Sequence, residues 1–74
     1  MTLAQLGSGA TARVVGVDGG WGLRRNLEQM GIHPGDVISV AGTGAFRGPI
    51  LIEVNGSRVA LGRGVAHRIR VEPL

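Results

Sequence analysis

Glycines interrupt the apolar segments of this 74-residue chain at short intervals, which limits the length of every regular element. The chain has 14 glycines, well above the usual share of ~7%, and they follow no collagen-like period. Glycine readily adopts the backbone angles that tight turns require. The spacing therefore favours several short strands joined by tight turns.

Five segments of the chain match short strands. Ile50, Ile52 and Val54 occupy alternate positions, as expected for a strand with one buried face. The dipeptide Asn55-Gly56 that follows them is the strongest hairpin signal in the chain. In the first strand, apolar residues at both parities predict partial cover on both faces. The predicted strands span residues 10–17, 37–41, 49–54, 57–61 and 68–72.

One short helix is predicted after the first strand, over residues 21–30. Leu23, Leu27 and Met30 recur at i, i+4 and i+7, which places them on one helix face. Gly31 suits the left-handed residue that ends many helices. A helix this short is marginal alone, so we expect it to dock on the strands. Shorter features are predicted at 2–7 and 62–67 (single helical turns) and at 42–48 (a glycine-rich loop).

The composition indicates one mainly β domain that spans residues 1–74. Hydrophobic residues make up 43% and charged residues 18%, which does not fit a disordered chain. The core must be aliphatic, because Trp21 and Phe46 are the only aromatic residues. The absence of cysteine excludes disulfides and thiolate metal sites. Five short strands favour a small barrel, since closure hides strand edges.

The positive charge of the chain comes entirely from arginine. The eight cations give a net charge of +3, and a basic chain is one sign of nucleic-acid binding. A charge of this size is also ordinary for a small domain, where ~2–8 is usual, and the chain has almost no aromatic platforms for single strands. We expect no nucleic-acid partner, and such binding is the alternative interpretation. The lack of lysine excludes a Walker A phosphate loop.

No segment resembles a membrane span or a targeting signal. No apolar run approaches the ~18 residues that a spanning helix needs. The first residues lack the charged and apolar regions of a signal peptide. We therefore expect a cytoplasmic protein that is not embedded in a membrane.

The chain contains the residue types of a hydrolase catalytic triad but lacks the sequence motif in which the nucleophilic serine usually lies. Serine, histidine and aspartate are present, but no serine lies in a G-x-S-x-G turn after a strand. A domain this small also lacks the walls that exclude water from an active site. We expect no enzymatic activity and no cofactor.

A metal site is conceivable around the first histidine. His33 and Asp36 lie three residues apart, and His67 or Glu53 would complete a nitrogen and oxygen ligand set. In the competing interpretation, His33 and Asp36 stabilise a turn around Pro34 and His67 lies on the surface. A specific site needs about four convergent ligands. We assign no metal, and the candidates are His33, Asp36 and His67.

Trp21 is the most informative single residue. It starts the predicted helix directly after two glycines, with Arg24 and Arg25 in the following turn. A lone Trp in an aliphatic protein is usually a core residue, but Trp and Arg are also favoured at interface hot spots. We interpret the helix and its flanks as a partner-docking surface formed by Trp21, Leu23, Arg24, Arg25 and Arg63.

The order of motifs resembles the FeoA family, small proteins of bacterial and archaeal ferrous iron uptake. The resemblance runs from Leu3 to Val71. It rests on Leu3-x-x-Leu6-x-x-Gly9, Val14-Val15-Gly16-Val17, Gly19-Gly20, Leu27-Glu28-Gln29-Met30-Gly31-Ile32-His33-Pro34-Gly35, Gly48-Pro49-Ile50, Asn55-Gly56, and the closing Leu61, Ala66, Ile69 and Val71. The chain departs from the family at Asn26, where members often have Arg.

The resemblance implies a fold, a partner and a role. The fold would be a Src-homology-3-like barrel with a helix inserted after the first strand. The partner would be FeoB, the membrane ferrous iron transporter with a cytosolic GTP-binding domain, and the role would be accessory or regulatory. The same barrel is similar to the C-terminal domains of some metal-dependent repressors, so a metal-binding or regulatory function is a further alternative. Self-association through an exposed strand edge is also open.

Overall fold

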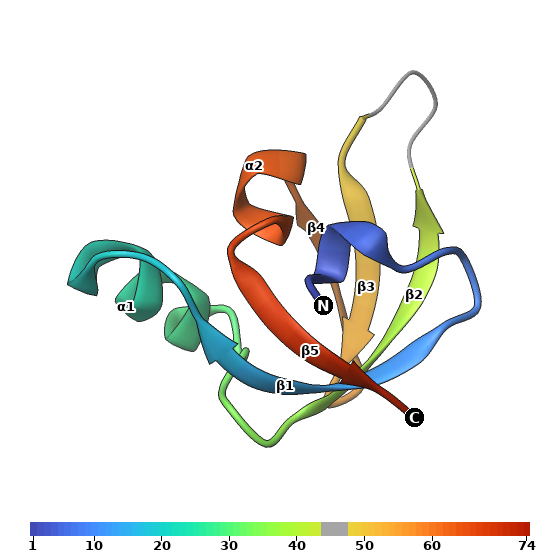
Figure 1. The fold of residues 1–74 in the computed structure, drawn as a ribbon, viewed down its shortest axis with the longest axis horizontal. Helices are drawn as coiled ribbons and strands as arrows, with labels where there is room; N and C mark the ends of the chain where they lie inside the picture. Colours follow the sequence, from blue (N-terminus) through green and yellow to red (C-terminus); the bar gives the residue numbers. More distant parts are fainter. Residues whose placement is uncertain (44–47) are drawn as a thin grey trace.

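Five antiparallel strands form one sheet in the computed structural model, which describes residues 1–43 and 48–74. The strand order in the sheet is β4-β3-β2-β1-β5, so the first strand pairs with both the second and the last (Figure 1). The strands are β1 (Thr11–Val17), β2 (Val37–Thr43), β3 (Ile50–Val54), β4 (Ser57–Leu61) and β5 (Ile69–Pro73). Within the described residues, three short helical elements accompany them: η1 (Leu3–Gln5), α1 (Trp21–Gln29) and α2 (Arg63–Ala66). The predicted mainly β class, with five strands and a helix after the first, is confirmed.

Irregularities in two central strands let the sheet wrap around its core. The pairing register shifts between Val14 and Gly16 in β1, and between Val40 and Gly42 in β2. Such bulges bend a strand and increase its twist. The enclosed core is aliphatic, as the composition required, and its largest fully buried side chains are Leu3, Leu27, Ile32, Ile38, Ile50, Ile52, Ile69, Val14 and Val40.

The first residues of the chain cover the outer edge of β5. Thr2 forms an isolated antiparallel bridge with Arg70, and the backbone N–H of Val71 donates to the carbonyl of Met1 at 2.8 Å. Leu3 is completely buried, so the turn η1 is fixed to the core as well as to the strand edge. This cover leaves the edge of β5 less available for pairing with another chain.

Helix α1 is attached to the barrel mainly through its C-terminal end and projects to one side of it (Figure 1). Gly31 has φ +87°, and the N–H of Ile32 donates to the carbonyl of Leu27 at 2.9 Å. The N–H of Gly31 donates to Glu28 at 3.0 Å, which completes a Schellman motif. Leu27 and Ile32 are each only 1% exposed. The predicted end of the helix at Gly31 is therefore confirmed, and Leu27 and Ile32 hold this end of the helix to the core.

Several local expectations differ from the structure. Met30 is 42% exposed, because Ile32 rather than Met30 fills the core position beside Leu27. Val15 is 40% exposed, so the expected cover on both faces of β1 is wrong at this position. Strand β2 extends to Thr43, which pairs with Ile50 beyond the bulge. Residues 44–47 of the predicted glycine-rich loop, including Phe46, lie outside the described residues.

Candidate protein-docking surface

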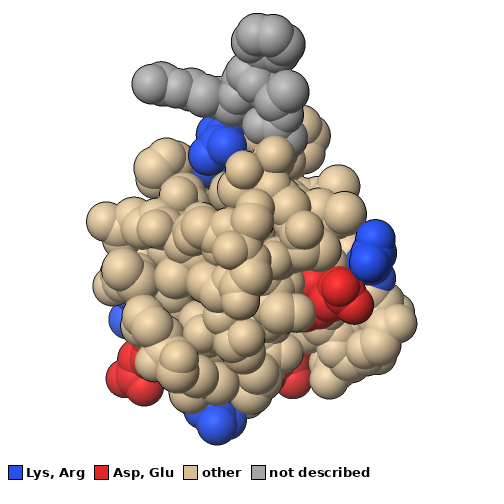
Figure 2. Space-filling view, turned by 90° about the vertical axis from the view of Figure 1, so that its right-hand side faces the viewer, with Lys and Arg blue, Asp and Glu red and all other residues tan. Residues whose placement is uncertain are grey.

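Charged side chains are distributed unevenly over the molecule. The face turned away from α1 shows scattered charged residues of both signs and no cluster of one sign (Figure 2). Helix α1, in contrast, carries the exposed residues Arg24, Arg25 and Glu28 within two turns. Arg68 and Arg70 are exposed at the start of β5. This strand start is joined to the end of β1, because the backbone N–H of Asp18 donates to the carbonyl of Arg68 at 2.7 Å.

Trp21 lies on the surface and not in the core. Its side chain is 72% exposed at the first position of α1, where Gly20 with extended backbone angles precedes it. The guanidinium carbon of Arg25 lies 5.1 Å from the centroid of the Trp21 ring, within cation–π range. A large exposed aromatic side chain with an arginine stacked on it is a typical composition for the centre of a protein interface.

The other predicted docking residues take different positions. Leu23 is half-buried against the core, and a Cβ on Gly19 would lie 2.6 Å from its Cδ2. Gly19 therefore allows the chain to pass close to this leucine. Arg24 is exposed on the same helix. Arg63 instead begins α2, a separate element, and is half-buried with its Nε lacking a hydrogen-bond partner among the described residues.

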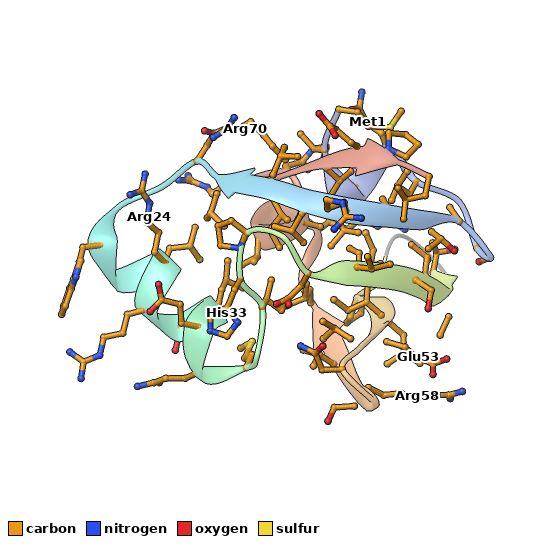
Figure 3. The ribbon with its side chains drawn as sticks, turned by 90° about the horizontal axis from the view of Figure 1, so that it is seen from below. Met1, Arg24, His33, Glu53, Arg58 and Arg70 are labelled. Carbon is orange, nitrogen blue, oxygen red and sulfur yellow. The ribbon has the colours of Figure 1, made fainter. Side chains whose placement is uncertain are left out.

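A groove of about 300 Å³ separates α1 from the adjoining ends of β1 and β5. We call it the α1 groove. Figure 3 shows Arg24 pointing from α1 toward the end of β1, where Arg70 also lies. Arg70 Nε donates to Asp18 Oδ1 at 3.0 Å. The groove is lined by Gly16, Val17, Arg24, Glu28, Ile32, Pro34 and Arg70.

Sequence reasoning missed Arg70, Asp18 and Gly16 as parts of this surface. Arg70 and Asp18 are 52 positions apart, and only the pairing of β1 with β5 brings them together. The alternation of residues 68–72 predicts that Arg70 faces outward, which is the one signal that pointed to it.

The residues considered as metal ligands do not come together as a complete set, although His33 and Asp36 lie in contact with each other. His33 and Asp36 begin and end a type II turn, in which Gly35 has φ +96° and the N–H of Asp36 donates to the His33 carbonyl at 3.1 Å. His67 caps α2, and Glu53 pairs with Arg58 at 3.5 Å, on another side of the molecule from His33 (Figure 3). Across residues 1–43 and 48–74, no three Asp, Glu, His or Cys side chains gather as a metal-binding group.

The Asp36 carboxylate stabilises the turn that it ends. Its Oδ2 accepts the backbone N–H of His33 at 2.7 Å and lies 3.3 Å from Nδ1 of the same residue. The backbone hydrogen bond from His33 holds the pKa of Asp36 below its ordinary value, with a further contribution from the Asn55 side chain. Asn55 Nδ2 also donates to the carbonyl of Gly31 at 3.4 Å, which joins the β3–β4 hairpin to the end of α1.

The strand order and the position of the helix define the class of this protein as a small Src-homology-3-like barrel with a helix inserted after the first strand. Neither α1 nor α2 has the length and apolar character of a membrane-crossing helix, within the part of the chain that the structure describes. A family model for the FeoA domain matches residues 1–73. The chain therefore belongs to the FeoA domain family, in agreement with the motifs in its sequence.

Similar proteins and solved structures agree with this assignment. The Putative Fe(2+) transport protein A of Methanocaldococcus jannaschii is 39% identical over 56 residues, which cover 76% of this chain and 66% of that protein. A crystal structure of an iron uptake regulatory protein (FeoA) is 39% identical with a TM-score of 0.91, covering 100% of this chain and 96% of the other. The zinc complex of FeoA from Stenotrophomonas maltophilia, described as a prokaryotic SH3 domain protein, is 28% identical with a TM-score of 0.83, covering 97% and 89%.

Proposed function

We propose that this protein is a non-enzymatic, cytoplasmic accessory protein of ferrous iron transport, which binds the cytosolic part of the FeoB transporter and modulates its activity. Membership of the FeoA family supports the link to iron transport. The observation that best supports a binding function is the exposed side chain of Trp21, on which Arg25 is stacked. Both residues lie on a helix that projects from the barrel.

The physical argument is the cost of leaving this aromatic side chain in water. Burial of an aromatic residue in an interface removes ~150–250 Å² of surface from solvent. Most of the binding energy of an interface comes from a few such residues, typically Trp, Tyr and Arg. Trp21 and Arg25 already hold a defined arrangement, so docking would cost little additional side-chain entropy. Leu23 and Arg24 extend this docking surface, and Arg63 is its outlying member on α2.

The test is titration calorimetry of the purified protein with the cytosolic domain of FeoB from the same organism, loaded with a GTP analogue or with GDP. We expect Trp21→Ala to weaken binding by about tenfold or more, the effect of a hot-spot residue. Met30→Ala is the matched control, because Met30 is an exposed apolar side chain at the other end of α1. Both variants should unfold at nearly the wild-type temperature.

Two results would contradict the proposal. One is the absence of binding with either nucleotide, and the other is equal affinity of the wild type and Trp21→Ala. Binding to nucleic acid that weakens steeply with salt, and that Trp21→Ala does not change, would instead favour the alternative interpretation of the arginines.

A further inference from the structure

The α1 groove carries two guanidinium groups above an apolar floor. Arg24 comes from α1 and Arg70 from β5, and both line the same cavity. The floor includes Val17, Ile32 and Pro34. A cavity of about 300 Å³ is at the small end of ligand pockets, so it suits one or two side chains of a partner and not a large cofactor.

Two neighbours orient the half-exposed side chain of Arg70. Asp18 Oδ1 accepts its Nε–H at 3.0 Å, and the guanidinium group lies against Gly16, where a Cβ would be 2.9 Å from the Arg70 Cζ. Among the described residues, the Nη groups of Arg70 make no hydrogen bond. A guanidinium with its Nε anchored and its Nη groups available is arranged to donate to a carboxylate.

Arg24 provides the second donor group. It makes no ion pair within 4.0 Å among the described residues, although Glu28 lies one turn later on the same helix and lines the same groove. Across this end of the molecule, Arg24, Arg25, Arg68 and Arg70 outnumber Asp18 and Glu28. The local charge thus favours an acidic partner. Glu28 disfavours a second carboxylate close to the first.

We propose that the α1 groove receives a single acidic side chain with an aliphatic neighbour, from an extended segment of a partner protein. The carboxylate lies between Arg24 and Arg70, and the aliphatic group packs against Val17, Ile32 and Pro34. This inference rests on the proposed function, because it names the chemistry of the segment that docks beside α1. It also extends the docking surface to Arg70, on a strand far from α1 in sequence.

The probe is a pair of peptides, acetyl-Leu-Glu-Leu-amide and acetyl-Leu-Gln-Leu-amide, titrated into the full chain and followed by nuclear magnetic resonance. We expect the Glu peptide to shift the Nε–Hε signals of Arg24 and Arg70 and the amide signals of Val17 and Ile32. The Gln peptide should bind about tenfold more weakly, because a charge-assisted hydrogen bond becomes a neutral one.

Variants of arginines inside and outside the groove show whether the preference for the Glu peptide comes from the groove or from the overall positive charge. The double variant Arg24→Gln with Arg70→Gln should lose the preference for Glu over Gln. Arg58→Gln should keep it, since Arg58 is also an exposed arginine paired with a carboxylate, at 3.5 Å from Glu53. Equal affinity for both peptides, or a preference that survives in the double variant, would overturn the inference.

The same variants distinguish this inference from the proposed function. If FeoB binds the wild type and the double variant equally, the groove is not part of the interface and the inference is wrong, while the proposed function stands. If FeoB does not bind the wild type, the proposed function fails. In that case the peptide titration alone decides the inference. A preference for the Glu peptide would support the groove as a site for acidic segments, and the absence of this preference would overturn the inference.

Discussion

Gly16 is the residue on which the shape of the α1 groove depends most directly. We predict that Gly16→Ala displaces the Arg70 guanidinium, because the added methyl would lie 2.9 Å from Cζ. The free energy of unfolding should change by less than ~1 kcal/mol, since the displaced atoms end a flexible, exposed side chain. Thermal unfolding and the Nε–Hε signal of Arg70 check this. Gly7→Ala is the control, because its methyl meets nothing within 4 Å, and an unmoved Arg70 signal would contradict the prediction.

Asp36 contributes a pH-dependent part of the stability. Its folded-state pKa is lowered, chiefly by the hydrogen bond from the His33 backbone, below the ordinary value of 3.8. The unfolded state therefore binds the proton more tightly, so this contribution is present above that value and is lost as the pH falls through the folded-state pKa. We predict a shallower acid destabilisation for Asp36→Asn than for the wild type. Urea unfolding in matched buffers from neutral to strongly acidic pH measures it, and parallel curves would refute it.

The stability of helix α1 depends on Gly31, the glycine that ends it, whereas Gly22 inside the helix should tolerate substitution by alanine. Gly31 has φ +87°, so Gly31→Ala should lower the free energy of unfolding by ~1–2 kcal/mol. Gly22 lies inside the helix with nothing within 4 Å of an added Cβ, so Gly22→Ala should raise it by ~0.5–1 kcal/mol. Denaturant unfolding measures the free energy of unfolding of both variants, which carry the same glycine-to-alanine substitution at two positions. Effects of the same sign would contradict this account of the helix.

Local signals predicted the elements, and long-range contacts determined the site. Gly31 and the Asn55-Gly56 hairpin, with φ of 51° and 79°, are identifiable because their conformations depend on adjacent residues. The sequence left both a core role and an interface role open for Trp21, and neither its exposure nor the groove around Arg70 follows from local signals. They depend on how far α1 projects and on bulges in β1 and β2, which only the packing of distant segments fixes.

At the scale of the whole molecule, the buried residues that the structure describes form one aliphatic core, so each large core side chain accounts for much of the stability. Ile52 on β3 is completely buried, and Ile52→Ala should cost ~2–5 kcal/mol out of the ~5–15 kcal/mol typical of folded domains. Leu51→Ala, on the half-buried face of the same strand, should cost clearly less. Urea unfolding measures both free energies. Equal losses of unfolding free energy in the two variants would contradict the prediction, because one face of β3 is buried in the core and the other is only half-buried.

The turn between β3 and β4 contains Asn55-Gly56, a dipeptide whose asparagine is prone to deamidation. In an Asn–Gly pair the backbone nitrogen of the glycine can attack the side-chain amide carbon, because no side chain shields it. Ammonia leaves, a cyclic succinimide forms, and water opens this ring to aspartate or isoaspartate. Deamidation of Asn55 would replace the amide that donates to the Gly31 carbonyl with a carboxylate. The new negative charge would lie beside that carbonyl and near Asp36, whose carboxylate Asn55 stabilises. Aged protein would thus lose the connection between the hairpin and the end of α1, and with it part of the support of the docking helix.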